Sequence, residues 1–442
     1  MSPTVGSPGT GPGQLWAAPV ATSPLDATVA VPGSKSLTAR YLLLAALADA
    51  PVVIRGGLRS RDSGLMVDAL RSLGVTVDDS EEEWRVTPGP IKGGDFVECG
   101  LAGTVMRFVP PLVLLAEAAV SFDGDSGARD RPMRPLIDAL RALGAKVDDA
   151  GIGALPFTVY PPRDVRAEVE IDASSSSQFI SGLLHVAPRL PKGLTIRDVG
   201  ATLPSLPHID MTVEALASAG VTVDRPDAHT WVVHPGRIHL GDVRIEPDLS
   251  NAGPFMAAAL AAGGTVRIPD WPASTTQPGA LVPALLERMG AVCSLHDGVM
   301  TVTSLGTIHG MDADLSACGE VTPTIAALCA LGDTPSTLRG IGHLRGHETD
   351  RLAAIASEIQ RLGGGCTVLP DGLEITPPAS GRLKGASVQT YHDHRMATFG
   401  AIIGLRVPRT KVVHVGTTAK TMPEFPTMWR DMLGTSAGPE AA

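Results

Sequence analysis

The segments MVDALRSLGVTVDD (66–79) and LIDALRALGAKVDD (136–149) are two copies of one pattern. Each predicts an amphipathic helix that ends at a glycine, Gly74 or Gly144, because glycine readily adopts the left-handed conformation that closes a helix. The two glycines define a period of about 70 residues. Repetition at a fixed period indicates a fold built from copies of one unit.

Strands surround this helix in every copy. Related helical segments recur at 211–224, 281–294 and 355–368. A short strand follows each helix: WRVTPG (84–89), PFTVYP (156–161), WVVHPG (231–236), MTVTSL (300–305) and LEITPP (373–378). Another strand precedes each helix, and the last one marks a sixth copy: VVIRGG (52–57), VSFDGD (120–125), LTIRDVG (194–200), TVRIPDW (265–271), STLRGIG (336–342) and KVVHVGTT (411–418). Alternation of apolar and polar residues predicts strands with one buried face.

A second helix with a polar start belongs to each copy. Its six versions are GSKSLTARYLLLAAL (33–47), CGLAGTVMRFVPPLVLL (99–115), SSSSQFISGLLHV (174–186), LSNAGPFMAAALA (249–261), GEVTPTIAALCAL (319–331) and HDHRMATFGAIIGL (392–405). Each copy is therefore a βαβαββ-like module, and we predict an α/β protein with three modules in each of two domains. We expect the domain junction near 243–247. Periodicity alone does not place the strand predicted in LDATVAVPG (25–33).

Composition excludes several classes of protein. The 442 residues, 44% of them apolar, suffice for two hydrophobic cores. A net charge of -10 argues against nucleic-acid binding, which needs a basic surface. The five cysteines form no CxxC pair, and no apolar run reaches the roughly 18 residues of a membrane span. We expect a cytoplasmic protein without a metal site or a membrane segment, in which residues 1–14 are a disordered tail rather than a signal peptide.

Basic residues gather at the starts of the predicted helices and in the loops beside them. They are Lys35, Arg40, Arg107, Arg131, Arg351, Arg395 and Lys420. Helix starts carry unpaired N–H groups and the positive end of the helix dipole, so several together can bind anions even in an acidic protein. Any one of these side chains could be an ordinary surface charge. Their recurrence in several copies favours a binding site.

Two serine-rich helix starts leave alternatives open. Ser36 and Arg40 are four residues apart and can face one ligand. Alternatively, Ser34 caps the helix beside solvated cations. The run SSSSQF (174–179) offers hydroxyl and amide groups to a polyol or phosphate, but it is equally a serine linker that caps a helix.

Other motifs are just as ambiguous when taken singly. Glu348 and Arg351 are neighbours on a helix and could form an ordinary surface ion pair. Gly103 lets the backbone approach a small ligand, or it is a turn glycine. His392 and His394 lack a third His or Cys at suitable spacing, so metal ligation is not predicted.

Taken together, seven motifs identify a family. They are GSKSLTAR (33–40), LAGTVMRF (101–108), DRPM (130–133), SSSSQF (174–179), HETDRL (347–352), DHRMA (393–397) and TTAKTMPEF (417–425). Their order resembles that of 5-enolpyruvylshikimate-3-phosphate synthases, over nearly the whole chain. The resemblance implies a two-domain inside-out α/β barrel whose domains close on their substrates. It assigns 34–245 to one domain and 15–33 with 246–442 to the other.

The resemblance also implies a reaction. Enzymes of this family transfer the enolpyruvyl group of phosphoenolpyruvate to the 5-hydroxyl of shikimate 3-phosphate and release phosphate, a step towards chorismate and the aromatic amino acids. No cofactor is implied, the expected partners are these two small molecules, and we expect a monomer. The implied ligands of shikimate 3-phosphate are Lys35, Ser36, Arg40, Ser176, Ser177, Gln178, Ser205, Glu320 and His347. The implied ligands of phosphoenolpyruvate are Lys35, Gly103, Arg131, Gln178, Arg351, Arg395 and Lys420.

Three residues are implied in proton transfer. Glu320 stands where the family places the acceptor for the proton of the attacking hydroxyl, although many members have Asp there. Glu348 and Lys35 are the candidates for proton transfer at the methylene carbon. The chain departs from the common family pattern at Leu101 (usually Asn), His208 (usually Tyr) and His347 (usually Lys). The last departure makes one substrate contact titratable near neutral pH.

The competing hypothesis is a UDP-N-acetylglucosamine enolpyruvyl transferase, which has a similar fold and relies on a reactive cysteine in a loop. None of the five cysteines here lies in a comparable PGGC-type loop. A binding protein without catalysis would have no need of the three proton-transfer residues.

Overall fold

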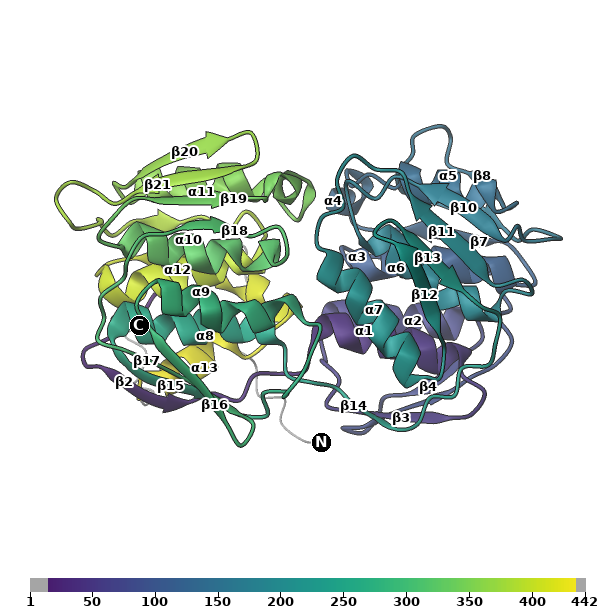
Figure 1. The fold of residues 1–442 in the computed structure, drawn as a ribbon, viewed down its shortest axis with the longest axis horizontal. Coiled ribbons are helices and arrows are strands. Elements are labelled where there is room, and N and C mark those ends of the chain that lie inside the picture. Colours follow the sequence, from purple (N-terminus) through teal and green to yellow (C-terminus); the bar gives the residue numbers. More distant parts are fainter. Residues whose placement is uncertain (1–14, 435–442) are drawn as a thin grey trace, which may run out of the picture. The chain divides into compact units, whose positions relative to one another are not determined.

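The chain folds into two compact units, seen in a computed structural model that describes residues 15–434 (Figure 1). The predicted tail at 1–14 lies outside the described residues. Within them, unit 1 contains 15–31, 249–273 and 279–434, and unit 2 contains 32–248 and 274–278. The domain bounds given above, 34–245 and 15–33 with 246–442, stay a prediction about the domains of the family.

Within the described residues, five of the six sheets are four-stranded and repeat one topology. In the sheet of β6 (Phe96–Glu98), β7 (Val120–Asp123), β8 (Lys146–Asp148) and β9 (Phe157–Tyr160), β6 and β7 are parallel, and β9 joins β7 to β8 in antiparallel pairing. The corresponding strands of unit 2 are β3 (Val52–Arg55), β4 (Thr76–Asp78), β5 (Trp84–Thr87) and β14 (Val243–Arg244), then β10 (Glu168–Ile171), β11 (Leu194–Asp198), β12 (Val223–Asp227) and β13 (Thr230–Val233). Those of unit 1 are β2 (Leu25–Thr28), β15 (Gly264–Ile268), β16 (Val292–His296) and β17 (Val299–Ser304), then β18 (Asp312–Asp314), β19 (Ser336–Arg339), β20 (Gly365–Leu369) and β21 (Gly372–Thr376).

The sixth sheet differs because the last copy has no hairpin of its own among the described residues. Its strands β22 (Ser387–Val388) and β23 (Lys411–Val413) are parallel, and β1 (Leu15–Ala17), from the other end of the chain, pairs antiparallel with β23. The strand that periodicity could not place, β2, pairs in parallel with β15 of unit 1. The first sheet of unit 2 is completed by β14, which pairs in parallel with β3.

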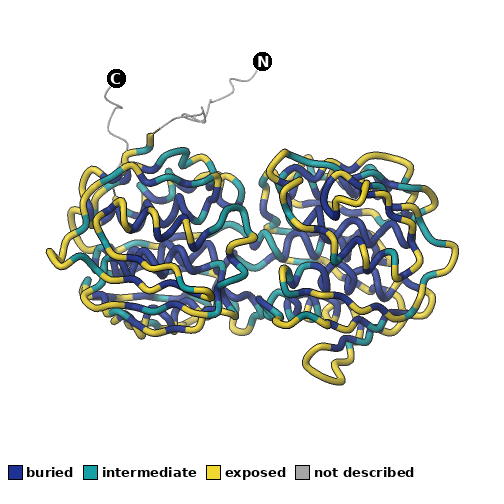
Figure 2. Tube along the Cα trace, turned by 90° about the horizontal axis from the view of Figure 1, so that it is seen from above, coloured by how far each residue is buried: buried dark blue, intermediate teal, exposed yellow. Residues whose placement is uncertain are grey.

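One helix of each copy lies inside its unit. These inner helices are α1 (Lys35–Leu47), α3 (Gly103–Phe108) and α6 (Gln178–Val186) in unit 2, and α8 (Leu249–Ala262), α10 (Thr322–Leu331) and α12 (His394–Arg406) in unit 1. Nearly all of their residues are buried, as expected of helices that are apolar all round. The three inner helices of each unit contact one another. Figure 2 shows buried chain in the interior of each unit and exposed chain around it.

The other helix of each copy is amphipathic and covers one side of the sheets. These outer helices are α2 (Arg61–Ser72), α5 (Arg134–Ala142), α7 (Leu206–Ser218), α9 (Val282–Arg288), α11 (Arg351–Arg361) and α13 (Phe425–Met432). The remaining short helices are α4 (Ser126–Arg129), η1 (Pro110–Leu115), η2 (Ala187–Arg189), η3 (Pro278–Leu281), η4 (Gly319–Val321), η5 (Gly342–Gly346) and η6 (Val415–Lys420). The predicted repeat of βαβαββ-like modules is therefore confirmed. No described helix is long and apolar enough to cross a membrane.

Candidate functional site

The start of α1 is held by two carboxylates of unit 2. Ser34 caps the helix and accepts a hydrogen bond from the N–H of Leu37. The N–H of Lys35 donates to Oδ2 of Asp248 over 3.2 Å, and its Nζ donates to Oδ2 of Asp62 over 3.3 Å. The positive end of the helix and the ammonium group therefore lie together, and the surrounding carboxylates stabilise both.

Arg40 is buried on the same helix and is hydrogen-bonded to oxygen atoms. It donates to Oγ1 of Thr212 over 2.8 Å, to the carbonyl of Ser36 over 2.9 Å and to the carbonyl of His208 over 2.6 Å. Its guanidinium lies 5.3 Å from the ring centre of Phe108. These contacts fix the plane of the guanidinium, and they tie α1 to α7.

Gly103, the first residue of α3, lies at the centre of a polar cluster. A Cβ atom built on it would lie 2.9 Å from Nη1 of Arg107, 3.3 Å from Oε1 of Gln178 and 3.4 Å from Nη1 of Arg131. Arg107 donates to Oε1 of Gln178 over 2.9 Å, and Arg131 donates to the carbonyl of Leu101 over 3.3 Å. A side chain at Gly103 would crowd this cluster, so glycine keeps the backbone accessible to the amide and guanidinium groups.

The predicted serines lie at the starts of α6 and α7. Oγ of Ser176 accepts a hydrogen bond from the N–H of Gln178 over 3.3 Å, and Ser177 occupies the capping position of α6 without a side-chain cap bond. Ser205 precedes α7 with a φ of 54°, in the left-handed region. That conformation is unfavourable for a residue with a Cβ atom and is concentrated at functional sites.

Arg351, the first residue of α11, organises the corresponding part of unit 1. It is buried, and its Nε lies 2.7 Å from Oδ2 of Asp393, while Nη2 donates to Oε2 of Glu348 over 2.9 Å. Nη1 lies 3.3 Å from Nδ1 of His347. Burial alone would lower the pKa of Arg351, but the attraction of Asp393 and Glu348 outweighs it and holds the pKa above its ordinary value. The group is therefore permanently cationic.

Lys420 and Arg395 extend this ion-pair network. Nζ of Lys420, at the end of η6, donates to Oε1 of Glu348 over 2.7 Å. Asp393 caps α12 by accepting a hydrogen bond from the N–H of Arg395 over 2.8 Å. Nη2 of Arg395 lies 3.4 Å from Oε2 of Glu320. The other carboxylate oxygen of Glu320, Oε1, accepts a hydrogen bond from the hydroxyl of Ser250. Three cations and three carboxylates thus lie in one connected group.

The structure brings several of the predicted residues together within each unit. In unit 2, Gly103, Arg131 and Gln178 form one cluster, and Lys35 lies at the start of α1, which contacts α3 and α6. In unit 1, Glu348, Arg351, Arg395 and Lys420 share one network. Such clusters of N–H, ammonium and guanidinium groups can bind phosphate and carboxylate groups.

Sequence reasoning missed several residues that hold this site. The main ones are Asp62 and Asp248, which contact Lys35, and Ser250, which contacts Glu320. Asp62 lies in the first turn of α2, and Ser250 lies in the polar helix start LSNAGPF (249–255). A polar residue at the start of a helix that is expected to be buried is the feature of the sequence that could have identified them.

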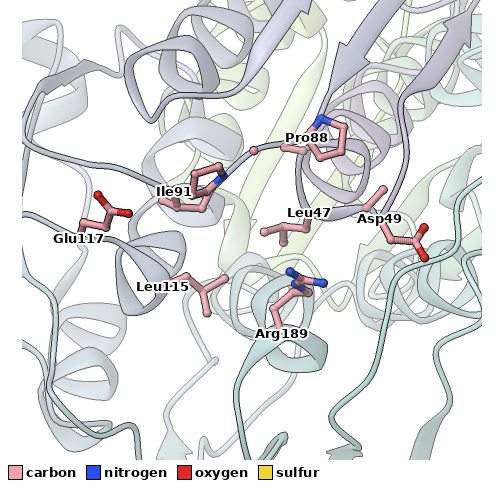
Figure 3. A pocket seen from close by; sticks show the side chains of 11 residues that line it. Leu47, Asp49, Pro88, Ile91, Leu115, Glu117 and Arg189 are labelled. Carbon is pink, nitrogen blue, oxygen red and sulfur yellow. The ribbon is translucent and has the colours of Figure 1, made fainter.

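A cavity of about 520 Å³ elsewhere in unit 2 contains none of the predicted site residues. It lies where α1, η1 and η2 end, and Figure 3 shows Leu47, Leu115 and Arg189 around it. Helix ends present carbonyl groups and the negative end of the dipole, so this cavity is a poor site for anions. Within residues 15–434, no group of three or more His, Cys, Asp or Glu side chains is arranged to hold a metal ion.

Comparison with known proteins decides the family. The family model for EPSP synthase (3-phosphoshikimate 1-carboxyvinyltransferase) matches residues 20–429. The chain belongs to this family. It is 53% identical over 436 residues to a 3-phosphoshikimate 1-carboxyvinyltransferase of Bifidobacterium longum, covering 95% of this chain and 98% of the relative. It is also 53% identical over 433 residues to one of Kocuria rhizophila, covering 95% of this chain and 97% of the relative.

Solved structures support the same fold at lower identity. An EPSP synthase from Acinetobacter baumannii superposes with a TM-score of 0.79 at 20% identity, covering 95% of this chain and 98% of that one. The enolpyruvyl transferase NikO from Streptomyces tendae superposes with a TM-score of 0.74 at 18% identity, covering the same shares. The fold of six α/β modules is thus shared with enolpyruvyl transferases.

Proposed function

We propose that this protein is a 3-phosphoshikimate 1-carboxyvinyltransferase, an enzyme of the shikimate pathway. It transfers the enolpyruvyl group of phosphoenolpyruvate to the 5-hydroxyl of shikimate 3-phosphate and releases phosphate. The observation that carries the proposal is the 53% identity to enzymes of that name over nearly the whole chain. The cation clusters of both units suit substrates that carry phosphate and carboxylate groups.

The two substrates are assigned to residues of both units. Shikimate 3-phosphate is bound by Lys35, Ser36, Arg40, Ser176, Ser177, Gln178, Ser205, Glu320 and His347. Phosphoenolpyruvate is bound by Lys35, Gly103, Arg131, Gln178, Arg351, Arg395 and Lys420. The hydrogen bonds that orient Arg40 and Arg351 support these assignments, since a guanidinium held in one plane loses little entropy when it binds an anion.

The reaction proceeds by addition and elimination. Glu320 takes the proton of the 5-hydroxyl as its oxygen attacks the second carbon of phosphoenolpyruvate, and Glu348 or Lys35 delivers a proton to the methylene carbon. The same carbon then loses a proton as the carbon–oxygen bond to phosphate breaks, which restores the double bond. Cations near the departing phosphate stabilise the charge that develops on it. The contact of 2.7 Å between Lys420 and Glu348 offers Glu348 a partner during these proton transfers.

The cysteines disfavour transfer to UDP-N-acetylglucosamine, which would rely on a reactive thiol. Burial raises the pKa of Cys99 well above its ordinary range and raises the pKa of Cys293, Cys318, Cys329 and Cys366 to about 12. Thiols with such values carry almost no thiolate near neutral pH. None of the five is therefore suited to that role.

Phosphate release tests the proposal. The purified protein should release phosphate only when shikimate 3-phosphate and phosphoenolpyruvate are both present. Arg395→Ala should lower turnover by about 10²- to 10³-fold, because it removes a cation that faces the developing charge. The control is Arg382→Ala, which removes an exposed arginine of the same unit and should leave turnover unchanged. Phosphate release that ignores shikimate 3-phosphate, or equal turnover in both variants, would contradict the assignment.

A further inference from the structure

Glu358 is a fully buried carboxylate of α11 that neither the family motifs nor the proposed reaction uses. It lies seven residues after Arg351, which is about two helical turns, so the two side chains share one face of α11. Both face the segment Gln389–Asp393, which joins β22 to α12. This segment leads directly to Arg395.

Glu358 holds the first half of this segment with both of its oxygens. The hydroxyl of Tyr391 donates to Oε1 over 2.7 Å, and the N–H of Gln389 donates to Oε2 over 3.1 Å. Arg351 holds the last residue of the segment through its contacts with Asp393. The segment is therefore fixed at its beginning, middle and end by a single helix.

The backbone of the segment needs such support. Tyr391 and His392 have φ values of 52° and 59°, so two consecutive residues with a Cβ atom lie in the left-handed region. This conformation is unfavourable for both and persists only where the surroundings hold it. The next residue, Asp393, caps α12 and contacts Arg351. A relaxed Tyr391 would therefore shift the carboxylate that orients Arg351 and the first turn of α12 that carries Arg395.

We propose that Glu358, acting through Tyr391, is a positioning residue for the phosphoenolpyruvate half of the active site. The proposal rests on the proposed function, because it concerns Arg351 and Arg395 as ligands of that substrate. Glu358 touches neither substrate nor reacting atoms; it sets the conformation of the segment that places both arginines. Small displacements of such groups are costly, since about 1 Å can lower a rate 10²-fold.

Two variants test the proposal, and steady-state kinetics with each substrate varied is the measurement. Tyr391→Phe removes only the hydroxyl and should lower kcat/KM for phosphoenolpyruvate about 10-fold. Glu358→Gln should lower it about 100-fold, because an amide cannot accept hydrogen bonds on both of its terminal atoms. Calorimetry should give a dissociation constant for shikimate 3-phosphate within about twofold of wild type in both variants. A general loss of folding would reduce the binding of both substrates.

Two controls separate positioning from simple stability. Tyr160→Phe makes the same change at a tyrosine of unit 2 and should leave both substrates unaffected. Gln360→Ala removes the hydrogen bond of 2.8 Å that α11 donates to the carbonyl of Cys366 in β20, outside the segment, and should change kcat/KM for phosphoenolpyruvate less than threefold. If Gln360→Ala is as harmful as Tyr391→Phe, a general loosening of α11 explains the loss and the proposal is wrong.

A double-mutant cycle completes the test. If Glu358 acts through Tyr391, the double variant should be little worse than Glu358→Gln alone. Effects that multiply would overturn the proposal, as would a Tyr391→Phe enzyme with wild-type kinetics. If Glu358→Gln does not fold, Tyr391→Phe alone decides. A wild-type protein without activity would instead contradict the proposed function.

Discussion

Two buried arginines of the candidate site are accommodated in different ways. Arg351 contacts the carboxylates of Asp393 and Glu348, which compensate for its loss of hydration. Arg40 donates to hydroxyl and carbonyl oxygens. The positive charge of Arg40 also affects the buried His185. Burial is the larger cause and repulsion from Arg40 the second, and together they lower the pKa of His185 to about 3. The imidazole of His185 lies 5.0 Å from the ring of Phe108, on which Arg40 packs.

His185 should make the stability of the protein depend on pH. In the unfolded chain an imidazole titrates near 6.5, so below that pH the unfolded state binds a proton that the folded state refuses. The contribution of neutral His185 is therefore complete above about pH 6.5 and is lost progressively as the pH falls towards 3. We expect the free energy of unfolding to fall by up to about 1.4 kcal/mol for each unit of pH in this range from His185 alone.

Urea unfolding of wild type and His185→Leu between pH 4 and 7 measures this term. The variant loses the hydrogen bond between Nδ1 and the carbonyl of Ser181, so its stability differs at every pH, but only the slope tests the prediction. Below pH 6, the difference between the two slopes should approach about 1.4 kcal/mol for each unit of pH. His296→Leu, at an exposed position, serves as the control and should leave the slope unchanged. Parallel curves for wild type and His185→Leu would show that His185 is protonated in the folded state.

The inner helices of unit 2 pack too closely for side chains at one glycine. A Cβ atom on Gly182 of α6 would lie 2.2 Å from the carbonyl oxygen of Arg107 on α3. Gly182→Ala should therefore push α6 and α3 apart, destabilise the protein by about 1–3 kcal/mol and break the contact between Arg107 and Gln178. Thermal unfolding and the dissociation constant for shikimate 3-phosphate should both change, the latter by at least tenfold.

Gly253 of α8 is the matched control, because it is also a buried glycine of an inner helix. A Cβ atom there meets nothing closer than 3.9 Å. Gly253→Ala should stabilise the protein by about 0.4–1 kcal/mol, since alanine restricts the unfolded chain and fits the helix. If both substitutions destabilise equally, the contact between α3 and α6 does not decide the effect at Gly182.

The sequence predicts the regular elements well and the unusual ones poorly. Strands such as VVIRGG (52–57) and helices such as LIDALRALG (136–144) have a strong period and recur, so they were predicted in type and place. The strand β1 was not predicted, because three residues carry too little pattern. Neither was β14, which pairs with a strand nearly 190 residues earlier in the chain.

The candidate site likewise contains residues that the local sequence reveals and contacts that it does not. Lys35 and Gly103 lie at helix starts, which local sequence reveals. The contact of Lys35 with Asp248 joins residues 213 positions apart, and that of Glu358 with Tyr391 depends on a left-handed turn without glycine. Neither has a local signal, because tertiary packing determines both.

Each unit of the molecule has its own hydrophobic core, but the units differ in how the chain builds them. Unit 2 uses one continuous segment, 32–248, and adds only 274–278. Its first sheet is completed inside that segment by β14. Unit 1 needs two distant parts of the chain, because β1 and β2 pair with strands that follow residue 249, and Leu25 and Val29 belong to its core.

This difference predicts which fragment folds alone. The fragment 32–248 should give the circular dichroism of a folded α/β protein and unfold cooperatively, because its three sheets, six main helices and core are complete. It loses the contacts of Gln277 with Glu246 and Pro247, so it should be less stable than the same residues in the whole chain. The fragment 249–434 should fail to fold alone, because β15 and β23 each lack a partner strand. Joining 15–31 through a flexible linker after residue 434 should restore its folding, since those residues supply both strands. A folded 249–434 without them would mean that β1 and β2 contribute little to the core of unit 1.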